Sequence, residues 1–368
     1  SIWIVVANSW QQTPAGHHMV QMVRDGRPLF IDGEPVLRAE IVNFWALVFN
    51  PSTIDLLVHV WIGAFIMGTF FVMSISAWYV LKKQHVEFAK KSFSGALIFA
   101  TIASLAALVS GHSQANMVYE YQPAKLAAFE GHFQTGPADM SLVGLSDGEA
   151  ERIRFNVAIP GGLSFLIHWD FDEPVVGLDR FRPDDRPPVF LTYTSYHIMI
   201  GLGMAFIGLT LLASFLHWRG RLYDTRWLMW VFVFAVLGPL VANQLGWVAA
   251  EVGRQPWIVH PPVEWTGDGD LVVGADGVVV YDEKLGLRTE DAVSTSVTAS
   301  QVLGSLIGFG AIYLFLLMAW LYVLDRKIRK GPEPLDEPIG GDRGGLLDAV
   351  AGRIDHLATI DEHTEGGR

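Results

Sequence analysis

Five long stretches of the chain contain no Asp, Glu, Lys or Arg, and this feature limits the possible folds more than any other. They run over Leu56–Leu81, Ser92–Tyr119, Pro187–Trp218, Trp227–Ala250 and Ala292–Leu324. Each exceeds the roughly 20 apolar residues that a helix needs to cross the hydrocarbon core of a bilayer. A buried helix of a soluble protein is rarely apolar over such a length. The sequence therefore predicts an all-α fold, a polytopic membrane helix bundle.

We expect five full spans and the end of a sixth helix. The full spans are expected near 53–81, 92–112, 189–217, 226–250 and 296–324. The chain opens with the apolar run SIWIVVA, which is too short to cross a membrane and stops at the polar residue Asn8. This run predicts the last turns of a helix whose beginning is missing, so we expect the chain to be a fragment.

Basic residues predict which connectors face the cytoplasm. The connectors 82–91, 219–226 and 325–330 together hold 11 of the 26 Lys and Arg residues. Because such residues collect in cytoplasmic loops, we place these connectors and the C-terminus in the cytoplasm. The long connectors are therefore expected outside, over 10–52, 113–188 and 251–295.

The predicted domain organisation is one transmembrane bundle over 1–330 followed by a cytoplasmic tail over 331–368. The tail is rich in Gly, Pro and acidic residues, which predicts disorder. The bundle carries an outer loop over 113–188 and an outer insertion over 261–290. Inside the insertion, LVVGADGVVVYDEK places two β-branched runs around Ala-Asp-Gly, a pattern typical of a hairpin.

Composition excludes several kinds of site. The chain has no cysteine, so disulfides and thiolate metal sites are impossible, and any metal must be held by His, Met or a carboxylate. The formal net charge of -12 argues against a nucleic-acid partner. The remaining candidates are polar side chains inside or beside the predicted spans.

Two side chains on separate spans suggest a metal centre. His59 lies about two turns below the expected outer surface among apolar neighbours, where a hydrogen bond to another helix and metal ligation are equally reasonable. Met199 lies about three turns below the same surface, and a lone membrane methionine is usually a packing residue. Together, His and Met form a known axial pair for a low-spin haem. His197 points to another face of the same helix and is a candidate propionate partner or an alternative ligand.

A second group of candidates lies where the 226–250 span meets the outer surface. Glu251 either marks the water interface, with Arg254 as its i+3 partner, or ligates an iron or relays protons while Arg254 neutralises a haem propionate. Trp247 and Trp257 are either interfacial anchors or the lining of a cofactor pocket. Pro239 predicts a kink within the span.

Three stretches together give the chain its resemblance to a known family. They are GWVAAEVGRQPW at 246–257, QPAKLAAFEG at 122–131, and the pair LVHVWIG and HIMIGLG around His59 and Met199. With these motifs the chain resembles subunit I of the cytochrome bd quinol oxidases from residue 1 to about 328, outside the insertion and the tail. The resemblance maps the five full spans onto the fifth to ninth of the family's nine, which leaves the first three spans and the histidine ligand they carry outside this chain.

The resemblance implies roles for individual residues. His59 and Met199 correspond to the axial ligands of the low-spin b-type haem, and Glu251 to the ligand of a high-spin haem, either b-type or d-type. Residues corresponding to those packed around the haems are Trp247, Arg254 and Trp257. Residues corresponding to the quinol-binding region are Gln122, Lys125 and Glu130, in a loop of the short type. The family often has arginine at the position of His197, so its propionate contact is a departure.

The resemblance also implies an activity and partners. It predicts a multi-pass subunit of a prokaryotic cell-membrane terminal oxidase that oxidises quinol, reduces O2 to water through haems and contributes to the proton gradient. Subunit II is an expected partner, with a small single-span subunit as a further candidate, and the fragment alone is expected to be inactive. Two alternatives are a non-catalytic haem-binding electron carrier and a membrane transporter gated by Glu251 and Arg254.

Overall fold

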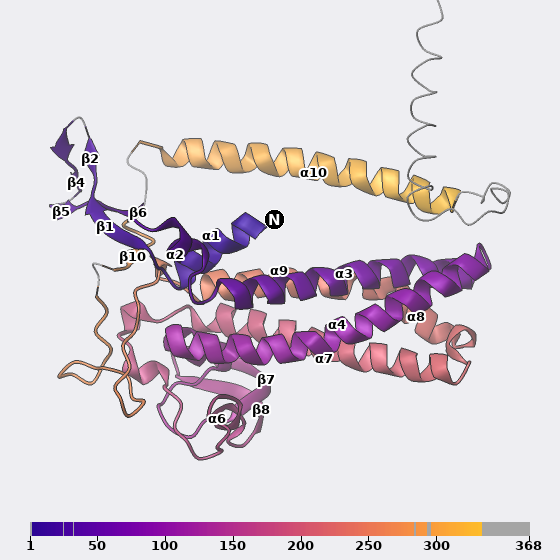
Figure 1. Cartoon of the computed structure of the whole chain (residues 1–368), viewed down its shortest axis with the longest axis horizontal. Coiled ribbons are helices and arrows are strands. Elements are labelled where there is room, and N and C mark those ends of the chain that lie inside the picture. The colour runs from indigo at the N-terminus through magenta and orange to yellow at the C-terminus, as the bar shows by residue number, and fades with distance from the viewer. Residues whose placement is uncertain (1, 25, 32, 283–284, 293–295, 333–368) are drawn as a thin grey trace, which may run out of the picture. The chain divides into compact units, whose positions relative to one another are not determined.

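The computed structural model describes residues 2–332 except 25, 32, 283–284 and 293–295 (Figure 1). Its contacts divide the chain into two compact units, Ser1–Tyr313 and Leu314–Arg368. Of the predicted disordered tail over 331–368, residues 333–368 lie outside the described residues. The helix α10, Ala299–Lys330, includes the boundary between the two units and ends in basic residues.

Five segments of the described chain are long and apolar enough to cross a membrane: Thr53–Lys82, Val86–Tyr121, Pro183–Trp218, Arg226–Val252 and Ala299–Lys330. This confirms the predicted membrane helix bundle. The second segment, helix α4 (Val86–Tyr121), extends beyond the expected 92–112 at both ends. The fourth segment is interrupted at Val236 and so forms α8 (Arg226–Ala235) and α9 (Leu237–Val252). Pro239 accounts for the break, because its ring nitrogen cannot donate to the carbonyl of Ala235.

Four spanning segments of the first unit form a closed ring. Helix α4 packs along both α3 (Thr53–Lys82) and α7 (Val189–Trp218), while α8 and α9 pack against α3 and α7 from the other side. The helices α3 and α7 therefore lie across the ring from each other, and their Phe70 and Phe206 rings are 5.0 Å apart. Around these rings lies the main apolar core, which includes Met73, Phe93 and Phe232.

The long connectors of the first unit gather at one end of the bundle, as Figure 1 shows. Helix α1 (Ile2–Gln12) is followed by small antiparallel hairpins and the short helix α2 (Phe44–Val48). The paired strands are β1 (His17–Gln21) with β6 (Leu37–Ile41), β2 (Val23–Arg24) with β3 (Arg27–Pro28), and β4 (Phe30–Ile31) with β5 (Glu34–Pro35). The sequence analysis predicted no strands here.

The next connector contains the short helix α5 (Pro123–Glu130), the antiparallel pair β7 (Met140–Asp147) and β8 (Arg152–Ile159), and α6 (Gly162–His168). The last connector begins with β9 (Trp257–Val259), which pairs with β10 (Leu287–Arg288). Between these strands the insertion forms isolated antiparallel bridges, Trp265 with Leu271 and Val273 with Val279, on either side of its turns. Side chains from all three connectors therefore meet at one end of the ring.

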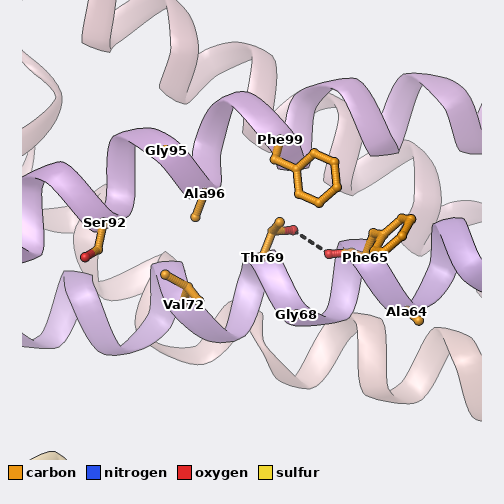
Figure 2. A pocket seen from close by; sticks show the side chains of 9 residues that line it. All are labelled: Ala64, Phe65, Gly68, Thr69, Val72, Ser92, Gly95, Ala96 and Phe99. Carbon is orange, nitrogen blue, oxygen red and sulfur yellow. Dashed lines mark hydrogen bonds between the residues drawn. The ribbon is translucent and has the colours of Figure 1, made fainter. Parts of the chain in front are cut away.

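A groove of about 430 Å³ lies between α3 and α4, well away from these connectors (Figure 2). Small residues form much of its floor, and the Phe65 and Phe99 rings, 5.3 Å apart, lie at one end. Its lining carries no ionisable side chain, so it is not a candidate for the chemistry expected from the sequence.

Candidate functional site

A buried polar cluster forms where α1, α5 and the end of α9 meet. Lys125 of α5 and Gln122, the residue that precedes this helix, are almost completely buried, with exposures of 5% and 2%. The Lys125 ammonium donates to the Gln12 side-chain oxygen at 2.8 Å, and the Gln122 amide donates to the Gln12 backbone carbonyl at 2.6 Å. Gln12, the C-terminal residue of α1, therefore holds two of the three side chains of the predicted quinol motif.

Arg254 joins this cluster from the α9 side. Its guanidinium donates to the Glu251 carboxylate at 2.6 Å and to the Gln11 side-chain oxygen at 3.0 Å. The other Glu251 oxygen accepts from the Asn8 side-chain amide. Arg254 is buried while the Glu251 side chain is 39% exposed, so this i+3 ion pair lies at the edge of the protein and not on a fully solvated surface. Both carboxylate oxygens are thereby fixed in orientation.

Burial shifts the protonation of Lys125 strongly. Desolvation, with a further contribution from the nearby Arg254 cation, lowers the Lys125 pKa to about 7, against a smaller opposing effect of Glu251. An amine with this pKa exchanges its proton readily near neutral pH. Lys125 is thus poised to hydrogen-bond to a ligand oxygen in either protonation state.

Glu130, at the last position of α5, has the complementary property. Burial raises its pKa to about 7, although a hydrogen bond from the Tyr196 hydroxyl opposes the shift. Its second oxygen, Oε2, is buried and has no partner among the described residues. The Tyr196 ring, on α7, stacks on the Phe129 ring with centroids 4.4 Å apart. This stacking fixes the Tyr196 hydroxyl beside the Glu130 carboxyl of α5. Once this carboxyl has ionised, the carboxylate can accept a proton at its unpaired oxygen.

His59 and Met199 project from the inner faces of α3 and α7. The His59 Nδ1 atom lies 2.9 Å from the Ser110 hydroxyl of α4, which leaves Nε2 as the nitrogen available to a ligand. His59 precedes Phe70 by three helical turns and Met199 precedes Phe206 by two, so the two side chains lie within about one turn of the same level. The Met199 sulfur lies next to Gly246 of α9, where an added Cβ would be 3.0 Å away.

At this level the ring lacks fully buried side chains. None occurs in α3 between Thr53 and Ile66, nor in the facing parts of the other three helices, 105–114, 196–205 and 240–248, all of which are described. Buried residues resume above and below this layer. The side chains of this cross-section, His59 and Met199 among them, are therefore only partly covered by the described chain.

The other predicted residues lie around these two regions. The His197 ring nitrogens lie 3.0 Å from the Tyr193 carbonyl and 2.9 Å from the Ser141 carbonyl of β7, so His197 connects the outer connector to α7. Trp257 is buried in an apolar cluster formed with the insertion, whereas Trp247 is half-buried on α9. Trp257 is therefore packed inside protein and is not an interfacial anchor.

Several residues of the site were not predicted from the sequence. Asn8, Gln11 and Gln12 were interpreted only as the polar end of a truncated helix, although consecutive amides after an apolar run are a signal for buried hydrogen bonding. Tyr196 and Ser110 could not be found because their partners are far away in the chain. In the described part of the chain, no three His, Asp or Glu residues are grouped as a metal cluster would require.

The fold and these two regions define a multi-pass helical membrane protein with a buried titratable site beside a four-helix ring. Residues 1–332 match the family model of cytochrome bd terminal oxidase subunit I. The chain therefore belongs to the cytochrome bd terminal oxidase subunit I family.

Relatives agree with this assignment. The cytochrome bd ubiquinol oxidase subunit 1 of Bacillus subtilis (strain 168) is 32% identical over 90% of this chain and 65% of its own length. The putative cytochrome bd menaquinol oxidase subunit I of the same organism is 36% identical over 67% of this chain and 57% of its own length. The bd oxidase structure from Geobacillus thermodenitrificans superposes with a TM-score of 0.66 at 25% identity, covering 90% of this chain and 67% of that one. The chain thus spans less than two thirds of the two Bacillus subtilis relatives.

Proposed function

We propose that this chain is part of a quinol:O2 oxidoreductase and contributes its quinol site and one haem-binding ring. The observation that carries the proposal is the pair Lys125 and Glu130, both buried in α5 at the end of the helical ring that carries His59 and Met199. Proton-coupled oxidation of a quinol needs groups of this kind beside an electron acceptor.

The quinol chemistry assigns a role to each group. Oxidation of a quinol to a quinone releases two electrons and two protons. Glu130, when ionised, accepts a proton from a quinol hydroxyl, and its pKa near 7 lets it pass that proton to water. Lys125, fixed by Gln12, hydrogen-bonds to a quinone oxygen, and Gln122 orients the backbone at the start of α5.

The ring residues fit a low-spin b-type haem. His59 and Met199 would hold the iron from opposite sides of the ring, with the His59 tautomer set by Ser110. The side chains at this level are only partly covered by the described chain, so a flat macrocycle would cover their exposed surface between the helices. When bound, the haem would supply a one-electron acceptor for quinol oxidation.

The Glu251 region fits the edge of a second haem. The partly exposed carboxylate would ligate a high-spin haem, b-type or d-type, while Asn8 and Arg254 hold its orientation. Arg254, Trp247, Trp257 and His197 are proposed as residues surrounding the haems, with Arg254 as the cation for a propionate. The complete enzyme would reduce O2 at a high-spin haem and would require subunit II, with a small single-span subunit as a further candidate partner.

We place the enzyme in a prokaryotic cell membrane, with the quinol connector outside and the C-terminus in the cytoplasm. The support for this orientation is the collection of basic residues in the connectors of the opposite end. Protons from quinol would then be released outside, which contributes to the proton gradient.

A reduced-minus-oxidised absorbance spectrum of the purified complete complex tests the proposal. We expect low-spin b-type bands in the wild-type complex. These bands should disappear in His59→Ala, which leaves the quinol-site residues unchanged. Persistence of those bands in His59→Ala would refute the ligand assignment. Absence of quinol-dependent O2 consumption by the wild-type complex would refute the activity.

A further inference from the structure

The insertion over 261–290 packs directly over α5. The Trp265 indole nitrogen donates to the Glu120 carbonyl at the end of α4 at 2.8 Å, and the Val279 amide donates to the Arg180 carbonyl of the outer connector at 2.8 Å. Arg288 forms an ion pair with Asp185 and lies 4.5 Å from the centre of the Trp257 ring. The insertion is therefore attached to the bundle and the outer connector along its length.

Tyr281 is the central side chain of this attachment. The residue is buried, with 9% exposure, and its ring lies 5.4 Å from the Trp257 ring and 5.7 Å from the His260 ring. The same apolar cluster includes Ala124, the residue before Lys125 in α5. Tyr281 thus shares one apolar cluster with the helix that carries the quinol motif.

The same segment also contacts the other support of Lys125. The backbone amide of His260, just before the insertion, donates to the Gln11 carbonyl at 3.0 Å. Gln11 receives the Arg254 guanidinium, and the adjacent Gln12 receives the Lys125 ammonium. The last connector therefore contacts α1 through the His260 amide and shares an apolar cluster with α5 through Tyr281, and Lys125 is held between these two helices.

We propose that Tyr281 is a positioning residue for quinol oxidation, acting through α5 to hold Lys125 against Gln12. This inference rests on the proposed quinol site for its effect on turnover, but its structural part does not. The Tyr281 hydroxyl has no hydrogen-bond partner among the described residues, so the ring and not the hydroxyl performs the positioning. Removing the ring opens a cavity in the apolar cluster that includes Ala124, so α5 loses part of its packing support.

The test compares Tyr281→Ala with Tyr281→Phe in the purified complete complex. In Tyr281→Ala, hydrogen exchange of the backbone amides in 123–130 should be faster by about tenfold or more, because α5 opens locally more often. The quinol KM should rise by a similar factor, about tenfold, because the ligand must bind to a disordered site, whereas kcat falls less. Tyr281→Phe should match the wild type in both measurements, and both variants should retain the haem spectrum.

The outcomes separate this inference from the proposed function. Unchanged amide exchange and KM in Tyr281→Ala, or equal losses in Tyr281→Phe, would overturn the positioning role. If exchange is faster in Tyr281→Ala but the wild-type complex lacks quinol activity, the structural role of Tyr281 would stand and the quinol assignment would be refuted. Should Tyr281→Ala fail to assemble, Val279→Ala makes a smaller cavity in the same cluster and should give smaller changes in the same direction; wild-type behaviour there would overturn the proposal.

Discussion

Replacement of Glu130 by Gln is the most direct test of the buried carboxyl. Gln keeps the volume and the hydrogen bond to Tyr196 but cannot ionise. Burial raises the Glu130 pKa from 4.5 to about 7, a shift that corresponds to roughly 3 kcal/mol of unfavourable free energy for the ionised side chain in the folded protein. This cost is absent when the carboxyl is protonated in both the folded and the unfolded state.

The sign of the pH effect follows from proton binding. Between pH 4.5 and about 7 the folded state holds a proton on Glu130 that the unfolded state has lost, so wild-type stability falls as the pH rises through this range. Glu130→Gln removes this dependence. The variant should therefore be more stable than the wild type at pH 8, by at most about 3 kcal/mol, and the difference should disappear below about pH 4.5.

Two measurements check this prediction. Thermal unfolding of the purified complex should show a higher midpoint for Glu130→Gln at pH 8 and the same midpoint at pH 4.5. Quinol kcat/KM of the wild type should rise with pH through about 7, because only the ionised carboxylate accepts a proton, and this rise should be lost in the variant. Glu264→Gln, at an exposed position, serves as the control. Identical pH profiles of stability in Glu130→Gln and the wild type would refute the reasoning.

Two further substitutions test the helices that hold the sites. Gln12→Leu removes the acceptor of the Lys125 ammonium, a hydrogen bond to a charged group worth about 1.5–3 kcal/mol. The quinol KM should rise about tenfold or more, and the haem bands should not change. An unchanged KM would contradict this role of Gln12. Gly246→Val places a side chain against the Met199 sulfur and should weaken the low-spin band in the absorbance spectrum, whereas Gly201→Ala, with nothing within 4 Å of the added carbon, should not. Equal spectra of the two glycine variants would argue against Met199 as a ligand.

The spans could be predicted because membrane insertion depends on local composition. Charge-free runs identify the helices, and Pro239 identifies the break between α8 and α9. The hairpins within 17–41 were not predicted because their strands are only two to five residues long and leave a weak periodic signal. The α4 ends were misjudged because polar residues there, such as Glu87 and Glu120, remain helical once the membrane has been crossed.

The candidate site was only partly predictable for a different reason. Lys125, Glu130 and Glu251 stand out as charges beside apolar segments, but their partners come from distant parts of the chain. Gln12 is separated from Lys125 by 113 residues, and Asn8 from Glu251 by 243. Pairings of this kind depend on which connectors share one end of the bundle, and a single sequence does not contain that information.

The shared end of the bundle also explains how buried charges are tolerated beside a membrane. An isolated ammonium or guanidinium in an apolar surrounding would be costly, because it loses its hydration. Here the side-chain amide oxygens of α1 replace water around Lys125 and Arg254, while Glu251 balances the guanidinium. Amides accept hydrogen bonds without adding charge, so Lys125 keeps a pKa near neutrality instead of being fixed as a cation by a carboxylate. An acidic residue in place of Gln12 would satisfy the same hydrogen bond but would raise the Lys125 pKa, and the group could then no longer exchange its proton near pH 7.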